Sequence, residues 1–84
     1  MAKIWAKIIT DHKVKASTLY DCGEEITATN FWAHVKAICE ELKIPTPVLL
    51  YSYSQQFLEF NLLKLKNRDF MEEIPFDLLQ LENG

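Results

Sequence analysis

The chain contains little glycine, proline or cysteine. It contains two glycines and three prolines in 84 residues, which excludes a collagen-like or linker-like composition. Two scattered glycines also cannot build the glycine-rich loop that cradles phosphate groups. The two cysteines, Cys22 and Cys39, are too few for a disulfide scaffold. We therefore expect free thiols and a reducing, cytoplasmic location.

Long apolar runs are also missing from the sequence. No stretch approaches the roughly 20 apolar residues that a bilayer-spanning helix needs. Lys7 interrupts the apolar start of the chain before it reaches the length of a signal peptide. We expect no association with membranes.

Positive charge is in the minority. Nine basic residues stand against twelve acidic ones, for a net charge of −3, whereas proteins that bind nucleic acid non-specifically usually carry the opposite sign. The balance is uneven, because residues 1–20 contain four lysines and a single acid, Asp11. This pattern permits a weakly basic hairpin on an acidic body, but an ordinary solvated face is the explanation that we favour.

Apolar residues are plentiful by contrast. They make up 49% of the chain and include five Phe, three Tyr and two Trp, which is typical of a globular protein and far above the level of disordered chains. A chain of this length buries about 60–65% of its unfolded surface. No linker, internal repeat or low-complexity segment divides it. We predict a single α+β domain over residues 1–84.

The first part of the chain has the pattern of two strands. In residues 3–10 and 13–20, successive side chains fall on opposite faces with a period of two residues. This period is typical of a strand with one buried face. In this pattern Trp5 and Lys7 share a face. The polar break at residues 11–12, an Asp followed by a His, tolerates positive φ better than most pairs. It predicts a hairpin with a tight turn, with a longer loop as the alternative.

One amphipathic helix is predicted over residues 27–43. Either Thr27 or Thr29 can accept a hydrogen bond from an unpaired N–H group of its first turn. Pro45 cannot continue the helix. The apolar face follows at steps of three and four residues through Phe31, Trp32, Val35, Ile38, Cys39 and Leu42.

Shorter elements complete the predicted fold. Residues 47–51 indicate a buried strand, residues 53–61 a short second helix, and residues 62–66 and 76–82 two further strands. The resulting order is ββαβ(α)ββ. We predict two layers, with the main helix across one face of an antiparallel or mixed sheet of four to five strands. The other face is then only partly covered, which leaves room for the short helix or for a second copy of the protein.

The chemistry-bearing residues do not have the spacing of a catalytic or metal site. His12, His34, Cys22 and Cys39 are candidate zinc ligands, but no two of them stand at the close steps typical of zinc sites. Cys22 needs a neighbouring base or cation to act as a nucleophile, and the strand lengths place His12 roughly 20 Å or more away. We predict no metal, no cofactor, no catalytic residue and no enzymatic activity, with a thiol-dependent enzyme as the second alternative.

The expected hairpin is one candidate binding surface. It carries Lys7, Lys13 and Lys15, with Trp5 on the sheet face of Lys7. Charge beside a stacking surface is the combination that binds single-stranded nucleic acid. The alternative, which we favour, is that Trp5 packs in the core or in an interface.

Two tyrosines mark the other candidate surface. Tyr51 and Tyr53 lie at the end of a predicted strand that can form a sheet edge. A tyrosine ring offers apolar area with a polar tip, and an open edge can pair with a strand of another chain. We therefore predict a protein-interaction or self-associating module that binds a protein partner or forms a homo-oligomer. A weak nucleic-acid-binding protein that uses the basic hairpin is the alternative.

Several short segments resemble a group of small bacterial proteins of unassigned function. These segments are residues 4–9, 11–13, 44–48, 70–72 and 75–77. The resemblance extends over most of the chain. It implies no activity, and no functional residue is carried over from it.

Overall fold

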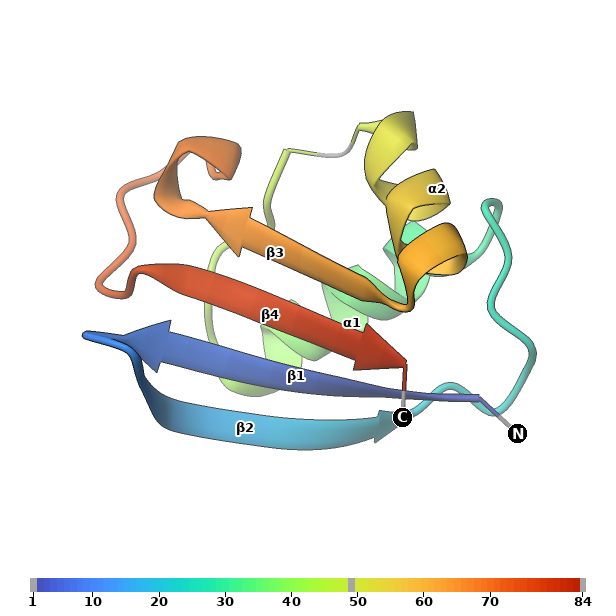
Figure 1. Cartoon of the computed structure of the whole chain (residues 1–84), viewed down its shortest axis with the longest axis horizontal. Helices are drawn as coiled ribbons and strands as arrows, with labels where there is room; N and C mark the ends of the chain where they lie inside the picture. Colours follow the sequence, from blue (N-terminus) through green and yellow to red (C-terminus); the bar gives the residue numbers. More distant parts are fainter. Residues whose placement is uncertain (1, 49, 84) are drawn as a thin grey trace.

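The computed structural model describes residues 2–48 and 50–83. The elements are β1 (Lys3–Thr10), β2 (Lys13–Asp21), α1 (Phe31–Leu42), α2 (Tyr51–Phe60), β3 (Leu62–Lys66), the 3₁₀ helix η1 (Asn67–Asp69) and β4 (Leu78–Asn83). Figure 1 shows how they are arranged. The predicted α+β class is confirmed, while the order of the main elements is ββααββ rather than ββαβ(α)ββ.

Within the described residues, four strands form one antiparallel sheet in the order β2-β1-β4-β3. The first and last strands of the chain lie side by side at its centre, where Ala6 pairs with Leu81. Leu81 in turn pairs with Leu63 on the edge strand β3. The sheet therefore has the lower of the two predicted strand numbers, and the mixed alternative is wrong.

The strand predicted at residues 47–51 is not formed. Pro47 makes only an isolated bridge to Phe70, and Tyr51 already begins α2; Leu49 lies outside the described residues. A proline has no N–H group for a strand ladder. The two buried residues of α2 stand three positions apart, at helical spacing. The segment therefore contributes a helix where its short apolar run predicted a strand.

The turn of the N-terminal hairpin is tight, as one of the two predicted alternatives states. Asp11 and His12 adopt φ angles of 53° and 64°, the left-handed region that two-residue hairpin turns require at both positions. The Asp11 backbone N–H donates to Oδ2 of Asp77 at 2.8 Å, and the Asp77 N–H donates to the carbonyl of Ile9 at 3.0 Å. The hairpin end is thus tied to the loop that precedes β4.

The main helix begins at Phe31, later than the predicted residue 27. Before it, the Thr27 N–H donates to Oδ1 of Asn30 at 2.8 Å, and the Asn30 N–H donates to Oγ1 of Thr27 at 3.3 Å. This reciprocal pair closes a turn ahead of the helix, so Thr27 shapes the start without capping it. The helix ends where Lys43 adopts a left-handed φ of 59°, shortly before Pro45.

Both helices pack on the same side of the sheet. The rings of Phe31 from α1 and Phe57 from α2 lie 4.9 Å apart. In Figure 1, α1 crosses behind the sheet, α2 stands beside the start of β3, and the near side of the sheet has no helix in front of it. The fully buried apolar side chains of this layer are Ile4, Ala6, Phe31, Val35, Ile38, Cys39, Phe57, Leu65, Leu79 and Leu81.

Candidate functional site

The fold leaves the side of the sheet away from the helices without a covering helix (Figure 1). Cross-strand partners point to the same side of an antiparallel sheet, so the strand register defines this surface, which we call the open face. Its side chains form three rows: Leu19, Trp5, Glu82 and Leu62; Ser17, Lys7, Gln80 and Lys64; and Val14, Ile9, Leu78 and Lys66.

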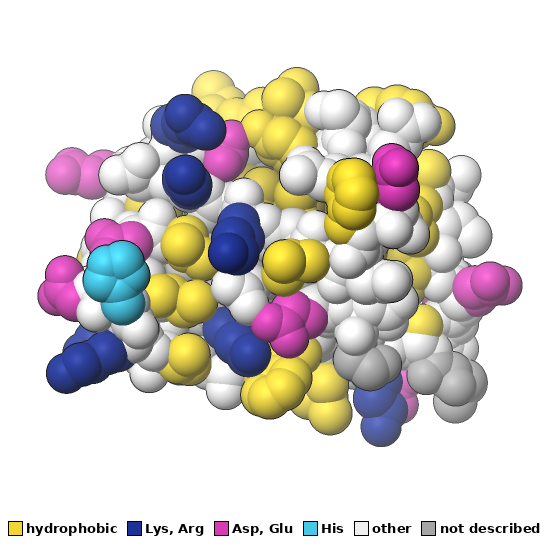
Figure 2. Space-filling model, viewed as in Figure 1, with side chains coloured by type: hydrophobic (Ala, Val, Ile, Leu, Met, Phe, Trp, Pro, Cys, Tyr) yellow, Lys and Arg dark blue, Asp and Glu magenta, His cyan; other side chains and the backbone are white. Residues whose placement is uncertain are grey.

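The β1–β2 half of the open face is rich in apolar side chains. Trp5 is 44% exposed, Val14 54% and Leu19 57%, and Ile9 is half-buried beside them. Figure 2 shows hydrophobic and lysine side chains mixed over this side of the molecule. Of the two placements predicted for Trp5, packing in the core is wrong, because strand alternation turns its ring away from the helices; packing in an interface stays a prediction.

Lys7 lies at the centre of the open face and has two partners. Its Nζ atom is 3.3 Å from Oε1 of Glu82 and 4.0 Å from the centroid of the Trp5 ring. Glu82 also accepts a hydrogen bond from the Gln80 side chain. A lysine above an indole ring is a cation–π contact. The predicted association of Trp5 with Lys7 on one sheet face is therefore confirmed.

The β3 edge of the open face is basic. Lys64 and Lys66 are exposed, and in the part of the chain that the structure describes neither lies in an ion pair. Together with Lys7 they outnumber the one acid of the face, Glu82, so the face carries a formal charge of +2. Because the whole chain carries −3, the remaining residues carry −5. The open face is thus a basic surface on an acidic molecule.

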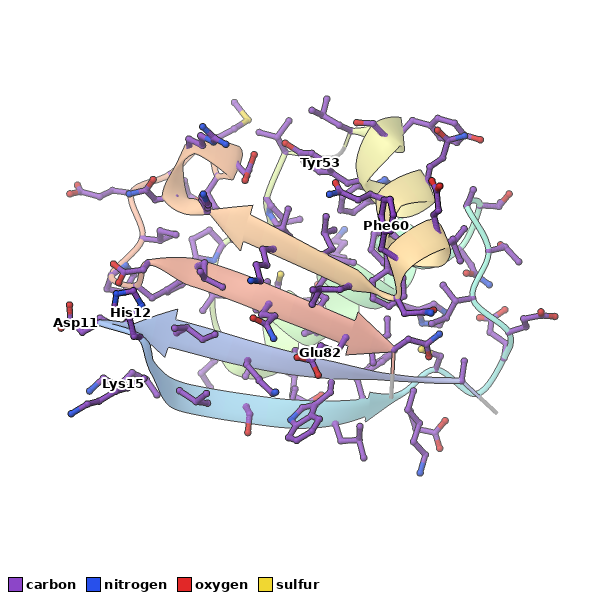
Figure 3. The ribbon with its side chains drawn as sticks, viewed as in Figure 1. Asp11, His12, Lys15, Tyr53, Phe60 and Glu82 are labelled. Atoms are coloured by element: carbon purple, nitrogen blue, oxygen red, sulfur yellow. The ribbon has the colours of Figure 1, made fainter. Side chains whose placement is uncertain are left out.

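A pocket of about 320 Å³ adjoins the same edge, between α2 and β3. Gln56 and Phe60 of α2 and Leu62 and Lys64 of β3 line it. Phe60 is 64% exposed and lies at the C-terminal end of α2 (Figure 3). The pocket continues the open face beyond β3, because two of its residues belong to both.

The other hairpin lysines are not part of this group. Lys13 pairs with Thr10, five residues along β1 from Trp5, a distance of roughly 17 Å at the rise of a strand. Lys15 is the extra residue where the register shifts between β1 and β2, at the hairpin end (Figure 3). The structure therefore brings Trp5 together with Lys7 and leaves Lys13 and Lys15 apart.

Tyr51 and Tyr53 both lie on α2, so the predicted edge strand that they were expected to flank is wrong. Tyr51 is exposed at the first turn of the helix. Tyr53 is half-buried, and its hydroxyl donates to Oδ1 of Asp69 at 2.6 Å. This hydrogen bond is the main cause that raises the pKa of Tyr53, with burial second. Tyr53 thus joins α2 to η1 rather than offering its polar tip to a partner.

Both thiols are buried and free. Burial, followed by the charges of Asp21 and Glu24, raises the pKa of Cys22. Burial and the charge of Glu40 raise the pKa of Cys39 from 9.0 to about 11. A nucleophilic cysteine needs a lowered pKa, so both environments act against thiolate formation.

His34 lies on the buried side of α1, although the helix pattern places it on the polar side. Its ring packs 5.7 Å from that of Tyr20. Its Nε2 atom is 3.2 Å from Oε2 of Glu24, without the alignment of a hydrogen bond. The ring fills space between α1 and β2. In residues 2–48 and 50–83, no three His, Cys, Asp or Glu side chains are grouped to hold a metal ion.

Sequence reasoning missed the β3 lysines as site residues. The alternation of Lys64 and Lys66 with two leucines correctly predicted a strand. It did not reveal that β4 inserts between β1 and β3, which puts Lys7 two strands from Lys64. Only the pairing of distant segments brings these lysines to one surface.

No family model matches the chain, and neither a curated protein nor a solved structure is significantly similar to it. The resemblance to small bacterial proteins stays a prediction. None of the described helices is long and apolar enough to span a membrane.

Proposed function

We propose that this protein is a non-enzymatic binding module that takes a protein partner on the open face of its sheet. The exposure of Trp5, Val14 and Leu19 carries the proposal. Covering apolar surface is favourable by about 25 cal/mol per Å², and contiguous exposed apolar patches are typical of interaction sites.

The arrangement of the sheet supports this role. All four strands contribute apolar side chains to the open face, and the strands are held in place by the core on the opposite side. A partner therefore meets a rigid surface and loses little free energy to ordering of the strands. The two buried thiols, with pKa values raised above 9.0, add support for a role without covalent chemistry.

Site-specific photo-crosslinking tests the proposal. A photoreactive amino acid replaces Leu19, which is exposed on the open face, and the variant is irradiated in cells that produce the protein. The matched control carries the same group at Ala33, an exposed residue of α1 on the opposite side of the molecule. We expect a discrete crosslinked product from position 19 and none from position 33.

The mass of the product separates the possible partners. A product of twice the mass of the chain identifies a second copy, and another defined mass identifies a different protein. Equal yields from both positions, or no product from position 19, would contradict the proposal.

A further inference from the structure

We propose that the partner is an acidic amphipathic polypeptide segment. It places apolar side chains on the β1–β2 half of the open face and carboxylates over the lysines of β3. This inference rests on the proposed function and specifies the chemistry of the partner.

The open face has two halves of different character. Ile9, Val14 and Leu19 lie on β1 and β2, whereas Lys64 and Lys66 lie on β3 at the far edge. An amphipathic helix or strand also has an apolar side beside a charged one. A segment that crosses the sheet therefore meets both halves in one pose.

The charge of the open face selects the sign of the partner. The face carries +2 on a molecule whose other residues carry −5, so its positive charge is a local feature. Lys7 already has Glu82 within 3.3 Å, which leaves Lys64 and Lys66 to pair with carboxylates from outside. A second copy stacked face to face would bring the same positive charge to the interface, which disfavours self-association through this surface.

The pocket beside β3 gives the partner a place for an anchor side chain. Phe60 and Leu62 supply apolar walls, and Lys64 supplies a cation at the same site. A volume of about 320 Å³ is at the lower end of the range for small-molecule sites. The pocket therefore suits an apolar side chain whose neighbour in the partner is acidic.

Single-stranded nucleic acid fits the open face less well. Such surfaces use several aromatic rings on which successive bases stack, whereas the strands of this face present one ring, Trp5, among aliphatic side chains.

Selection from a random peptide library on the immobilised protein tests the inference. We expect the enriched peptides to combine a negative net charge with apolar residues at helical or strand spacing. Synthetic copies are then titrated against the wild type and the double variant Lys64→Glu/Lys66→Glu, which we expect to bind them at least tenfold more weakly. The control variant Lys36→Glu/Lys43→Glu makes the same charge change at two exposed lysines, one within α1 and one directly after it. We expect its affinity for the peptides to stay within twofold of the wild-type value.

Each other outcome overturns a defined part of the account. Peptides that are basic or neutral, or that bind equally well after Lys64→Glu/Lys66→Glu, refute an acidic partner. If such peptides nevertheless bind the variant Val14→Thr/Leu19→Thr more weakly than the wild type, the proposed function stands without the acidic partner. If no open-face variant changes their binding, or if no peptide is enriched, both proposals fail.

A parallel titration uses fluorescently labelled 15-mers of deoxythymidine and uridine at low salt, where attraction to phosphate is strongest. We expect no binding that depends on Lys64 and Lys66. Oligonucleotide binding that is lost in Lys64→Glu/Lys66→Glu would replace the polypeptide partner by a nucleic acid. Circular dichroism of every variant confirms that the fold is retained before its binding is compared.

Discussion

At the scale of single residues, burial determines what the titratable groups of this protein can do. Cys39 is fully buried in the apolar face of α1, where a free thiol behaves as a small hydrophobic group. Desolvation disfavours its charged form, so its pKa rises to about 11. His34 is likewise enclosed, beside Tyr20 and Glu24. Neither residue is available to a substrate from solution.

The raised pKa of Cys39 makes stability depend on pH in a defined window. Below pH 9 the thiol is neutral in the folded and the unfolded state, so its contribution to stability is fully present. Between pH 9 and about 11 the unfolded chain releases the proton first, and the free energy of unfolding falls by about 2–3 kcal/mol. Denaturant titrations of the wild type and Cys39→Ala across this range measure the effect. Equal pH slopes for the two proteins would contradict it.

At the scale of elements, local hydrogen bonds decide where the hairpin and the main helix begin and end. Asn30 makes three of them before α1: it accepts from the Thr27 N–H, donates its own N–H to Thr27, and donates from its side chain to the Glu25 carbonyl at 2.9 Å. At the hairpin, two residues occupy the left-handed region, which costs a non-glycine residue roughly 1–2 kcal/mol.

Asn30→Ala is expected to lower the free energy of unfolding by about 1 kcal/mol, because the turn before α1 loses all side-chain hydrogen bonds of this residue. Asn30→Asp keeps the acceptor for the Thr27 N–H and loses the donor to Glu25. We expect its free energy of unfolding, measured by urea titration, to lie between those of Asn30→Ala and the wild type. An alanine variant as stable as wild type would show that this turn does not hold the start of the helix.

His12→Gly is expected to stabilise the protein by roughly 0.5–1 kcal/mol, because glycine reaches a positive φ without steric strain. The shift in the thermal midpoint checks the expectation. The matched variant His12→Ala retains the strain and should not stabilise. A destabilised glycine variant would mean that the imidazole makes a favourable contact that outweighs the strain.

The elements with a regular pattern could be predicted from the sequence, and the remainder depended on tertiary context. Period-two alternation gave β1 and β2, and steps of three and four gave α1. Residues 47–51 are apolar and short, so their pattern fits a strand and the entry to a helix equally well. The position of β4 between β1 and β3 is fixed by pairings such as Leu79 with Leu65 and Ile8, which no local signal reveals.

At the scale of the whole molecule, one face of the sheet packs on the core and the other, the open face, has no helix over it. The shared sheet face of Trp5 and Lys7 could be predicted because both residues lie on a single strand. The placement of Lys7 on one surface with Lys64 could not be predicted, because it depends on distant strands, and the edge strand expected beside Tyr51 is a helix. The acidic balance of the whole chain also concealed the positive charge of the open face.

Open-face residues are expected to contribute little to stability. The variant Val14→Thr/Leu19→Thr replaces two exposed side chains with threonine, which is also favourable in strands. The free energy of unfolding should therefore change by no more than about 0.5 kcal/mol. Leu79→Ala, on the opposite face of the sheet and fully buried, should cost about 2–5 kcal/mol. Urea titrations compare the two. A large loss in the threonine variant would mean that the open face is needed for folding.

The most direct test of the proposed binding surface is methyl NMR of the protein titrated with a selected acidic peptide. We predict that the shifts concentrate on Ile9, Val14, Leu19, Leu62 and Leu78, which all lie on the open face. The methyl groups of Ile38 and Leu81 in the core should move little. Shifts centred on Ala33 and the outer side of α1, with the open-face methyl groups unchanged, would contradict the account.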